Sequence, residues 1–139
     1  MEYLTQDEMI SINAITQIDQ HQQPSVRDAE ALDYIVKSAK QEVFGSVLYD
    51  TAEKLTAFYF IKLIKKHVFN DANKRTAYTA AFLFLDKNNC HLPSSKEFQL
   101  QFAQLAIEIA KTEGESKALW EKVTNFFDKH ISSAPRPSA

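Results

Sequence analysis

Glycine is almost absent from this chain, and that scarcity limits what the chain can fold into. Only Gly45 and Gly114 occur among 139 residues, whereas average usage is about 7%. Walker-type phosphate loops and dinucleotide-binding fingerprints need closely spaced glycines, and hairpin-rich β folds need many turn glycines. These classes are therefore excluded. Since 45% of the residues are hydrophobic, the chain can fill a core, and we expect an all-α fold.

Length and charge limit the class of protein further. The length fits one domain, which we place at residues 1–131 with a disordered tail at 132–139. A net charge of −2 gives no field that would gather nucleic acid or anionic lipid, so we expect neither as a partner. The single cysteine, Cys90, cannot form an internal disulfide. The N-terminus lacks a signal peptide and no apolar run reaches membrane-spanning length, which favours a cytoplasmic location.

Start signals followed by apolar residues three and four apart predict a compact bundle of six to seven helices. The helix from Asp50 is apolar nearly all round, and so is the helix from about Asn73, so both should be central. Residues 44 to 50, just before the first central helix, are expected to form a short flap, either a loop or a small hairpin. The six expected helices begin at Thr5, Ser25, Asp50, Asn73, Ser94 and just before Leu119. The first is expected to end before Asp19 and the second before Gly45, while the fourth should end before Asn88 and the fifth before Gly114.

The segment that joins the two central helices is the most polar stretch in the most apolar surroundings. It runs from His67 to Thr76 and contains His, Asn, Asp, Lys and Arg side chains. Lys74 and Arg75 would lie in the first helical turn, where the free amides and the macrodipole favour negative charge. Two cations in that turn destabilise the helix unless an anion is bound, so the pattern predicts a phosphate site.

Each residue of this segment also has a purely structural interpretation. His67 could cap the helix before it, although the neighbouring Lys65 and Lys66 favour a neutral imidazole that can accept a proton. Asp71 or Asn73 could be an N-cap, and Phe69 is expected to anchor the loop in the core. We interpret Lys62, Lys65 and Lys66 as solvated or stabilising a helix end, and the acidic pair Glu113 and Glu115 as capping or solvated. The other three histidines are interpreted as ordinary surface or interface residues: His21, His91 and His130.

Taken together, the residues from His67 to Ala77 resemble the signature of the Fic/Doc family, specifically its death-on-curing (Doc) toxin branch. The family pattern is H-x-F-x-[DE]-[GA]-N-[GK]-R, and every fixed position is met in this sequence. The resemblance implies an all-helical fold with the active loop between two central helices. It also implies an enzyme that modifies a hydroxyl of a target protein.

Two activities are compatible with this resemblance. Doc toxins are protein kinases that use ATP and Mg²⁺ to phosphorylate translation elongation factor Tu and arrest protein synthesis, whereas most Fic proteins transfer a nucleotidyl group such as AMP or UMP. Ala72 and Lys74 replace glycines of the AMP-transferring members, and Tyr78 replaces their second arginine. A lysine at the mouth of the phosphate site would change how a triphosphate lies, which favours γ-phosphate transfer over the alternative.

The resemblance assigns a role to each residue of the loop. His67 would be the general base, and Asp71 would orient Mg²⁺ or the hydroxyl. Ala72 and Asn73 would form the anion hole. Lys74 and Arg75 would bind phosphates. The flap would dock an extended stretch of the target beside His67.

The resemblance also implies a partner chain. Toxins of this branch are restrained by an antitoxin whose C-terminal region folds as a helix on the toxin. Some Fic proteins carry their own inhibitory helix with the pattern [ST]-x-x-x-E-[GN]. The nearest match in this sequence begins at Ser38 and does not fit the pattern, because Glu42 is followed by Val43. A non-enzymatic alternative stays open at this point: a helical interaction module whose loop only binds an anion or a partner.

Overall fold

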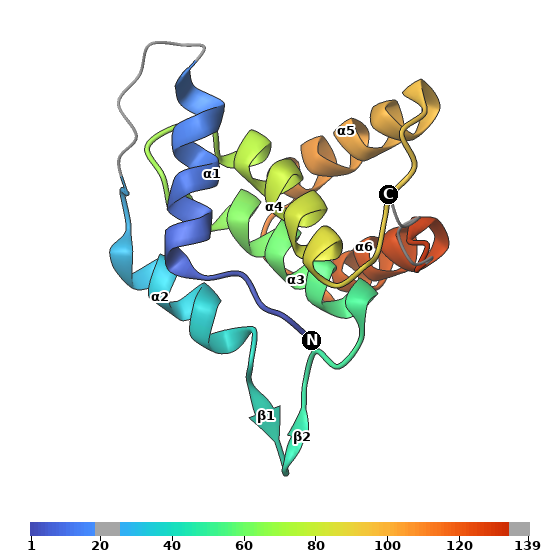
Figure 1. Ribbon diagram of the computed structural model, residues 1–139, viewed down its shortest axis with the longest axis horizontal. Helices are drawn as coiled ribbons and strands as arrows, with labels where there is room; N and C mark the ends of the chain where they lie inside the picture. The colour runs from blue at the N-terminus through green and yellow to red at the C-terminus, as the bar shows by residue number, and fades with distance from the viewer. Residues whose placement is uncertain (19–25, 134–139) are drawn as a thin grey trace, which may run out of the picture.

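Six helices and one small hairpin make up residues 1–18 and 26–133, which are the residues that the computed structural model describes (Figure 1). The all-α class is therefore confirmed, with no seventh helix in this part of the chain. The elements in chain order are α1 (Gln6–Ile18), α2 (Ala29–Ser38), β1 (Glu42–Val43), β2 (Ser46–Val47), α3 (Ala52–Lys65), α4 (Asn73–Lys87), α5 (Lys96–Lys111) and α6 (Lys117–His130).

Helix α3 is the centre of the bundle, as its apolar sequence predicts. Every residue from Leu55 to Ile64 is buried. Helix α4 packs along α3 through small residues, Ala77, Ala80 and Ala81. Figure 1 shows α1 and α2 on one side of this central pair and α5 and α6 on the other. The two buried helices therefore meet at the loop of residues 67–72, which is the position that the sequence predicts for a site.

Side-chain caps open five of the helices, and some differ from the expected ones. The capping box of α1 is confirmed, because Thr5 Oγ1 accepts from the Glu8 amide at 3.1 Å and Glu8 Oε1 accepts from the Thr5 amide at 2.9 Å. Helix α2 is capped by Asp28, so the predicted start at Ser25, which lies outside the described residues, was too early. Helix α3 is capped by Thr51 rather than Asp50.

The predicted flap is a β-hairpin, and it begins earlier than expected. Helix α2 ends at Ser38, so Val43, predicted to continue the helix, instead pairs with Ser46 in the hairpin. Phe44 (φ 52°) and Gly45 (φ 80°) form the turn, and positive φ at both central residues is the geometry that suits a two-residue hairpin. Figure 1 shows the hairpin projecting from the body beside the start of α3.

The C-terminal part of the chain is tied back to the loop between α4 and α5. Ser132 exchanges two backbone hydrogen bonds with His91, at 2.8 and 2.9 Å. Helix α5 ends at Lys111, before the predicted stop at Gly114. Residues 134–139 lie outside the described residues, so the predicted division into a domain at 1–131 and a disordered tail stays a prediction. Within the described part, none of the helices combines the length and the apolar character that crossing a membrane requires.

Candidate active site

The loop between α3 and α4 is held by its own backbone and by buried side chains. Val68 and Phe69 are fully buried. The Val68 carbonyl accepts from the amides of Arg27 at 2.7 Å and Asp28 at 3.1 Å, which fastens the loop to the start of α2. Phe69 therefore lies in the core, as its apolar side chain predicts, and takes no place in the pocket beside it.

Two residues of the loop adopt an unfavourable backbone conformation. His67 has φ 47° and Ala72 has φ 62°, in the left-handed region that non-glycine residues rarely occupy. They stand at the two ends of the loop, and such conformations persist only where the surroundings enforce them. His67 directly follows the C-cap residue Lys66, where a left-handed residue commonly ends an α-helix, and its imidazole makes no hydrogen bond to the last carbonyls of α3 among the described residues. His67 turns the chain away from the helix axis.

The N-terminus of α4 presents backbone amides without a side-chain cap. Its cap residue, Ala72, has no side chain that could accept a hydrogen bond. The first helical bond runs from the Thr76 amide to the Ala72 carbonyl at 2.8 Å, so the amides of Asn73, Lys74 and Arg75 precede the helical ladder. No acceptor for these three amides occurs among the residues that the structure describes.

The side chain of Asn73 braces the loop with both of its polar groups. Its Oδ1 accepts from the Phe69 amide at 3.1 Å, and its Nδ2 donates to the Phe69 carbonyl at 2.9 Å. Asn73 can therefore offer its backbone amide to an anion, while its side chain fixes the shape of the loop. The expectation that Asn73 and the amides around Ala72 form an anion hole stays a prediction.

Two cations at the start of α4 have no ion-pair partner among the residues that the structure describes. Lys74 and Arg75 are exposed, and neither makes an ion pair within the described part of the chain. The nearby lysines differ: Lys65 Nζ donates to the Thr112 carbonyl, and Lys66 Nζ lies 5.4 Å from the centre of the Tyr34 ring. These contacts are with uncharged groups, so Lys65 and Lys66 add positive charge to the pocket wall, while Lys74 and Arg75 are the cations at the end of the helix itself.

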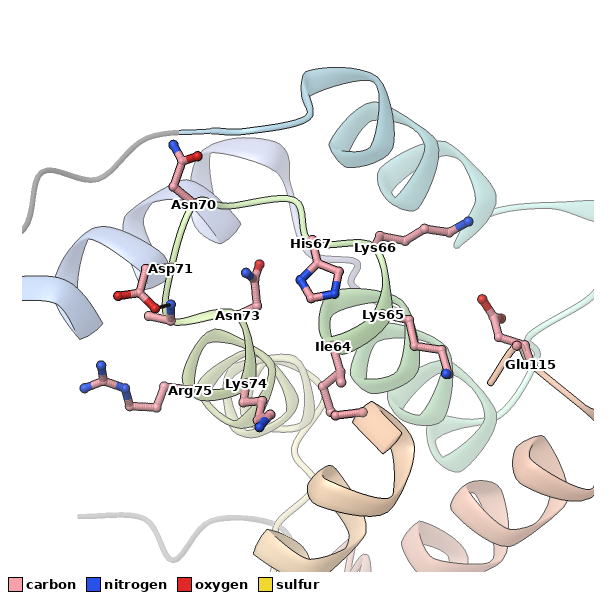
Figure 2. A pocket seen from close by; sticks show the side chains of 13 residues that line it. Ile64, Lys65, Lys66, His67, Asn70, Asp71, Asn73, Lys74, Arg75 and Glu115 are labelled. Carbon is pink, nitrogen blue, oxygen red and sulfur yellow. Dashed lines mark hydrogen bonds between the residues drawn. The ribbon is translucent and has the colours of Figure 1, made fainter. Parts of the chain in front are cut away.

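A pocket of about 850 Å³ brings these groups together. Figure 2 shows His67, Asn73 and Lys74 around its middle, Asp71 and Arg75 at one side, and Glu115 at the opposite side. The imidazole of His67 is exposed to this space, not sealed in the core. The lining residues are Ile64, Lys65, Lys66, His67, Asn70, Asp71, Ala72, Asn73, Lys74, Arg75, Ala110, Gly114 and Glu115.

Asp71 supplies the carboxylate nearest to the uncapped helix end. Its Oδ1 accepts from the Ala72 amide at 2.7 Å, and its side chain is exposed. No group of three or more His, Cys, Asp or Glu side chains that could hold a metal occurs among the described residues. A cation at Asp71 would therefore need phosphate oxygens and water as its remaining ligands, which is the coordination that Mg²⁺ favours.

Tyr78 lies outside the pocket. Its ring packs on Phe60 and Phe102 at 5.6 and 4.7 Å between ring centres, and its hydroxyl donates to the Phe102 carbonyl at 3.4 Å. Burial raises the pKa of the Tyr78 phenol, so it stays neutral. Position 78 of this chain therefore brings no charge to the pocket.

Sequence reasoning missed three buried polar residues beneath the loop: Asn13 and Gln17 of α1 and Thr76 of α4. Asn13 Nδ2 donates to the Asp71 carbonyl at 3.0 Å and to Thr76 Oγ1 at 3.1 Å. The available signal was the position of Asn13 four residues after buried Met9, on the apolar side of α1.

Lys62 was expected to be solvated or to stabilise a helix end. The first alternative was wrong, although Lys62 does lie in the last turn of α3, and the assignment of Glu115 to capping or solvation was also wrong. Lys62 Nζ lies 2.7 Å from Glu115 Oε1, with only 10% and 21% of the two side chains exposed. Glu115 also accepts from Trp120 Nε1 at 3.3 Å, and the Lys62 ammonium lies over the rings of Tyr34 and Trp120. This ion pair joins α3 to the segment between α5 and α6, at the edge of the pocket.

Replacing Glu115 by alanine is expected to destabilise the fold by about 3 kcal/mol, because it leaves the buried Lys62 charge without its partner. The double variant Lys62→Met with Glu115→Gln removes both charges and should recover most of the loss. Urea unfolding of the two variants measures this difference. Equal stabilities of the Glu115→Ala variant and the parent would show that the pair contributes nothing.

His91 and His130 take no part in the pocket. His130 packs against the rings of Phe98 and Phe126, and His91 takes part in the backbone bridge to Ser132. His21 lies outside the described residues. Of the described histidines, His67 is therefore the one that faces the uncapped helix end.

Comparison with known proteins places this loop and its helices in a family. The family model described as Fic/DOC matches residues 3–85, a span that runs from before α1 into α4 and contains the whole loop. The chain belongs to the Fic/DOC family. It is also similar to the protein kinase doc of Escherichia phage P1, with 29% identity over 97 residues that cover 70% of this chain and 76% of that protein.

Proposed function

We propose that this chain is a Doc-type toxin that transfers the γ-phosphate of ATP to a Ser or Thr hydroxyl of translation elongation factor Tu. One observation carries the proposal: an exposed imidazole and an uncapped, doubly cationic helix start line the same pocket. Family membership and the similarity to the phage P1 kinase support it. Modification of that factor would arrest protein synthesis.

The chemistry needs positioning and charge stabilisation more than covalent help from the protein. The amides of Asn73, Lys74 and Arg75, with the side chains of the last two, would hold the β- and γ-phosphates. His67 would accept the proton of the target hydroxyl as its oxygen bonds to the γ-phosphorus. The bond from that phosphorus to the bridging oxygen then breaks, and ADP leaves with the charge that the cations stabilise.

Asp71 fits a role at a magnesium ion bound to those phosphates. One carboxylate oxygen accepts a hydrogen bond from the Ala72 amide, and the second has no hydrogen-bond donor among the residues described. When bound, Mg²⁺ would neutralise phosphate charge. Asp71 itself would orient the phosphates relative to His67.

Two positions favour transfer of the γ-phosphate over transfer of a nucleotidyl group. Lys74 extends into the pocket where the AMP-transferring proteins carry a glycine, and Tyr78 is turned into the core where they carry a second arginine. The phosphate contacts of this chain are thus concentrated at the first turn of α4. That arrangement suits a bound triphosphate whose terminal phosphate faces His67.

Two surfaces are candidates for macromolecular partners. The hairpin carries Phe44 fully exposed at its tip, with Val43 and Leu48 about half exposed, and could dock an extended stretch of the target. The hairpin precedes α3 and His67 follows it. A target segment that contacts both must therefore span the length of α3, which is roughly 21 Å for fourteen residues. We also propose an antitoxin whose C-terminal region folds as a helix on the toxin, since such restraint accompanies this branch of the family.

Incubation with elongation factor Tu and either γ-labelled or α-labelled ATP tests the activity. Label from the γ position alone supports the kinase, with the His67→Asn variant as the background. Label from the α position of ATP, or of UTP, would establish the alternative, a nucleotidyltransferase. Absence of label from every donor would favour a binding module.

A further inference from the structure

We propose that Asn13 of α1 is a positioning residue for the active loop, holding the peptide between Asp71 and Ala72 in the one orientation that keeps the phosphate site open. This inference rests on the proposed function, because it concerns the same site. It assigns a purpose to a side chain that never touches the pocket.

The side-chain amide of Asn13 is fully buried, and its hydrogen bonds reach the loop, the first turn of α4 and the neighbouring Gln17. Its Nδ2 donates to the Asp71 carbonyl at 3.0 Å and to Thr76 Oγ1 at 3.1 Å, while its Oδ1 accepts from Gln17 Nε2 at 2.5 Å. Gln17 Nε2 also lies 3.5 Å from the Asp71 carbonyl. A leucine at position 13 could fill this space without burying polar atoms, so bulk alone does not require an amide here.

The bond to the Asp71 carbonyl fixes more than one atom. A peptide unit is planar and trans, so its N–H points opposite to its carbonyl. Because Asn13 holds the Asp71 carbonyl on the α1 side, the Ala72 N–H faces away from α1, where it donates to Asp71 Oδ1 at 2.7 Å. Asn13 thereby orients the carboxylate that we propose to act at the magnesium ion.

The same bond holds Ala72 in its unfavourable conformation. Ala72 has φ 62°, and alanine would relax to a negative φ if the peptide before it rotated by half a turn. That rotation would swing the Asp71 carbonyl away from Asn13 and to the side where the Ala72 amide now meets Asp71 Oδ1, at the start of α4. A carbonyl oxygen there would repel a phosphate and could accept the hydrogen bonds that the phosphate needs.

The position of α1 suits this purpose. Figure 1 shows α1 alongside the loop, and the hydrogen bonds from Asn13 reach both the loop and the first turn of α4, through Asp71 and Thr76. Asn13 and Gln17 are one helical turn apart, so the second amide supports the first. The loop is consequently braced from beneath by α1 and from its own interior by Asn73.

Binding of inorganic pyrophosphate measures the state of the phosphate site without any transfer reaction. The Asn13→Leu variant is expected to bind it at least about tenfold more weakly than the parent, because the flipped carbonyl misplaces the site. Thr76→Val keeps the hydrogen bond from Asn13 to the Asp71 carbonyl, so its pyrophosphate affinity should fall less than that of Asn13→Leu. Thr56→Val removes a buried hydroxyl of α3 that donates to the Ala52 carbonyl, and it should leave pyrophosphate affinity within twofold.

A second measurement separates positioning from general destabilisation. In ¹⁵N-labelled protein, Asn13→Leu should shift the Ala72 and Asn73 amide resonances and speed hydrogen exchange of the Ala72 amide, which donates to Asp71 Oδ1, while amides in the middle of α3 stay protected. Parent-like pyrophosphate affinity in Asn13→Leu would overturn the proposal. A loss of pyrophosphate affinity that simply parallels the loss of thermal stability in Asn13→Leu, Thr76→Val and Thr56→Val would overturn it too. If Asn13→Leu does not fold, Gln17→Leu is measured instead, with about threefold weaker binding expected and unchanged binding contradicting the proposal.

Failure of the proposed function has a different outcome. A parent protein that binds no pyrophosphate would remove the phosphate site itself. The resonances of Ala72 and Asn73 would then still decide whether Asn13 holds the loop: parent-like shifts in Asn13→Leu would refute the positioning role, and displaced shifts would support it.

Discussion

Replacing His67 by asparagine is expected to slow phosphoryl transfer by about 10²–10⁴-fold, the usual contribution of a positioned general base. The imidazole is exposed and makes no hydrogen bond within the described chain, so its loss should hardly affect the fold. Asparagine suits this position because it tolerates the left-handed conformation that His67 adopts. Steady-state transfer of the γ-phosphate measures the effect, and thermal unfolding checks the fold.

The matched control is His91→Asn, a histidine that lines no part of this pocket. It should keep parent-like activity. In cells, expression of the His67→Asn variant should no longer arrest growth, whereas the His91→Asn variant should arrest it. Growth arrest by both variants would contradict an enzymatic role for His67 and favour the binding-module alternative.

The double variant Lys74→Ala with Arg75→Ala is expected to weaken ATP binding by about 100-fold or more, since each charge-assisted hydrogen bond contributes about 1.5–3 kcal/mol. Stability should move in the opposite direction. Cations in the first turn oppose the helix macrodipole, so their removal should stabilise α4 by about 0.3–1 kcal/mol for each charge at low salt. Calorimetric titration with ATP and urea unfolding measure the two quantities.

Lys96→Ala is the control for this pair, because Lys96 is also exposed in the first turn of a helix, α5, outside the pocket. It should give a similar small gain in stability and leave ATP binding unchanged. A double variant at positions 74 and 75 that lost stability and kept its affinity for ATP would show that these cations serve the fold rather than a ligand.

Local signals in the sequence were sufficient for several elements. The capping box from Thr5 to Glu8 depends on residues within one turn, so its spacing defines it. The unbroken apolar run of α3 predicts its central place for the same reason. The conflict between Lys74, Arg75 and the helix dipole also predicted where the uncapped amides lie.

Contacts between distant residues explain what the sequence could not predict. Lys62 and Glu115 are 53 residues apart, and neither carries a local mark of burial. Asn13 lies 58 residues from the Asp71 carbonyl that it holds, so it could only look like a polar interruption of the apolar face of α1. The end of α2 was missed because Gly45 was interpreted as its stop, whereas this glycine turns a hairpin that begins at Glu42.

Titration of ¹⁵N-labelled protein with ATP and Mg²⁺ tests most directly whether the start of α4 is a polyphosphate site facing His67. The backbone amides of Asn73, Lys74 and Arg75 should show the largest, saturable shifts, and the ring resonances of His67 should move with them. A second, smaller pocket is lined by residues that include Phe82, Cys90 and Leu92. Shifts confined to that pocket, or the absence of any saturable change at α4, would contradict the account.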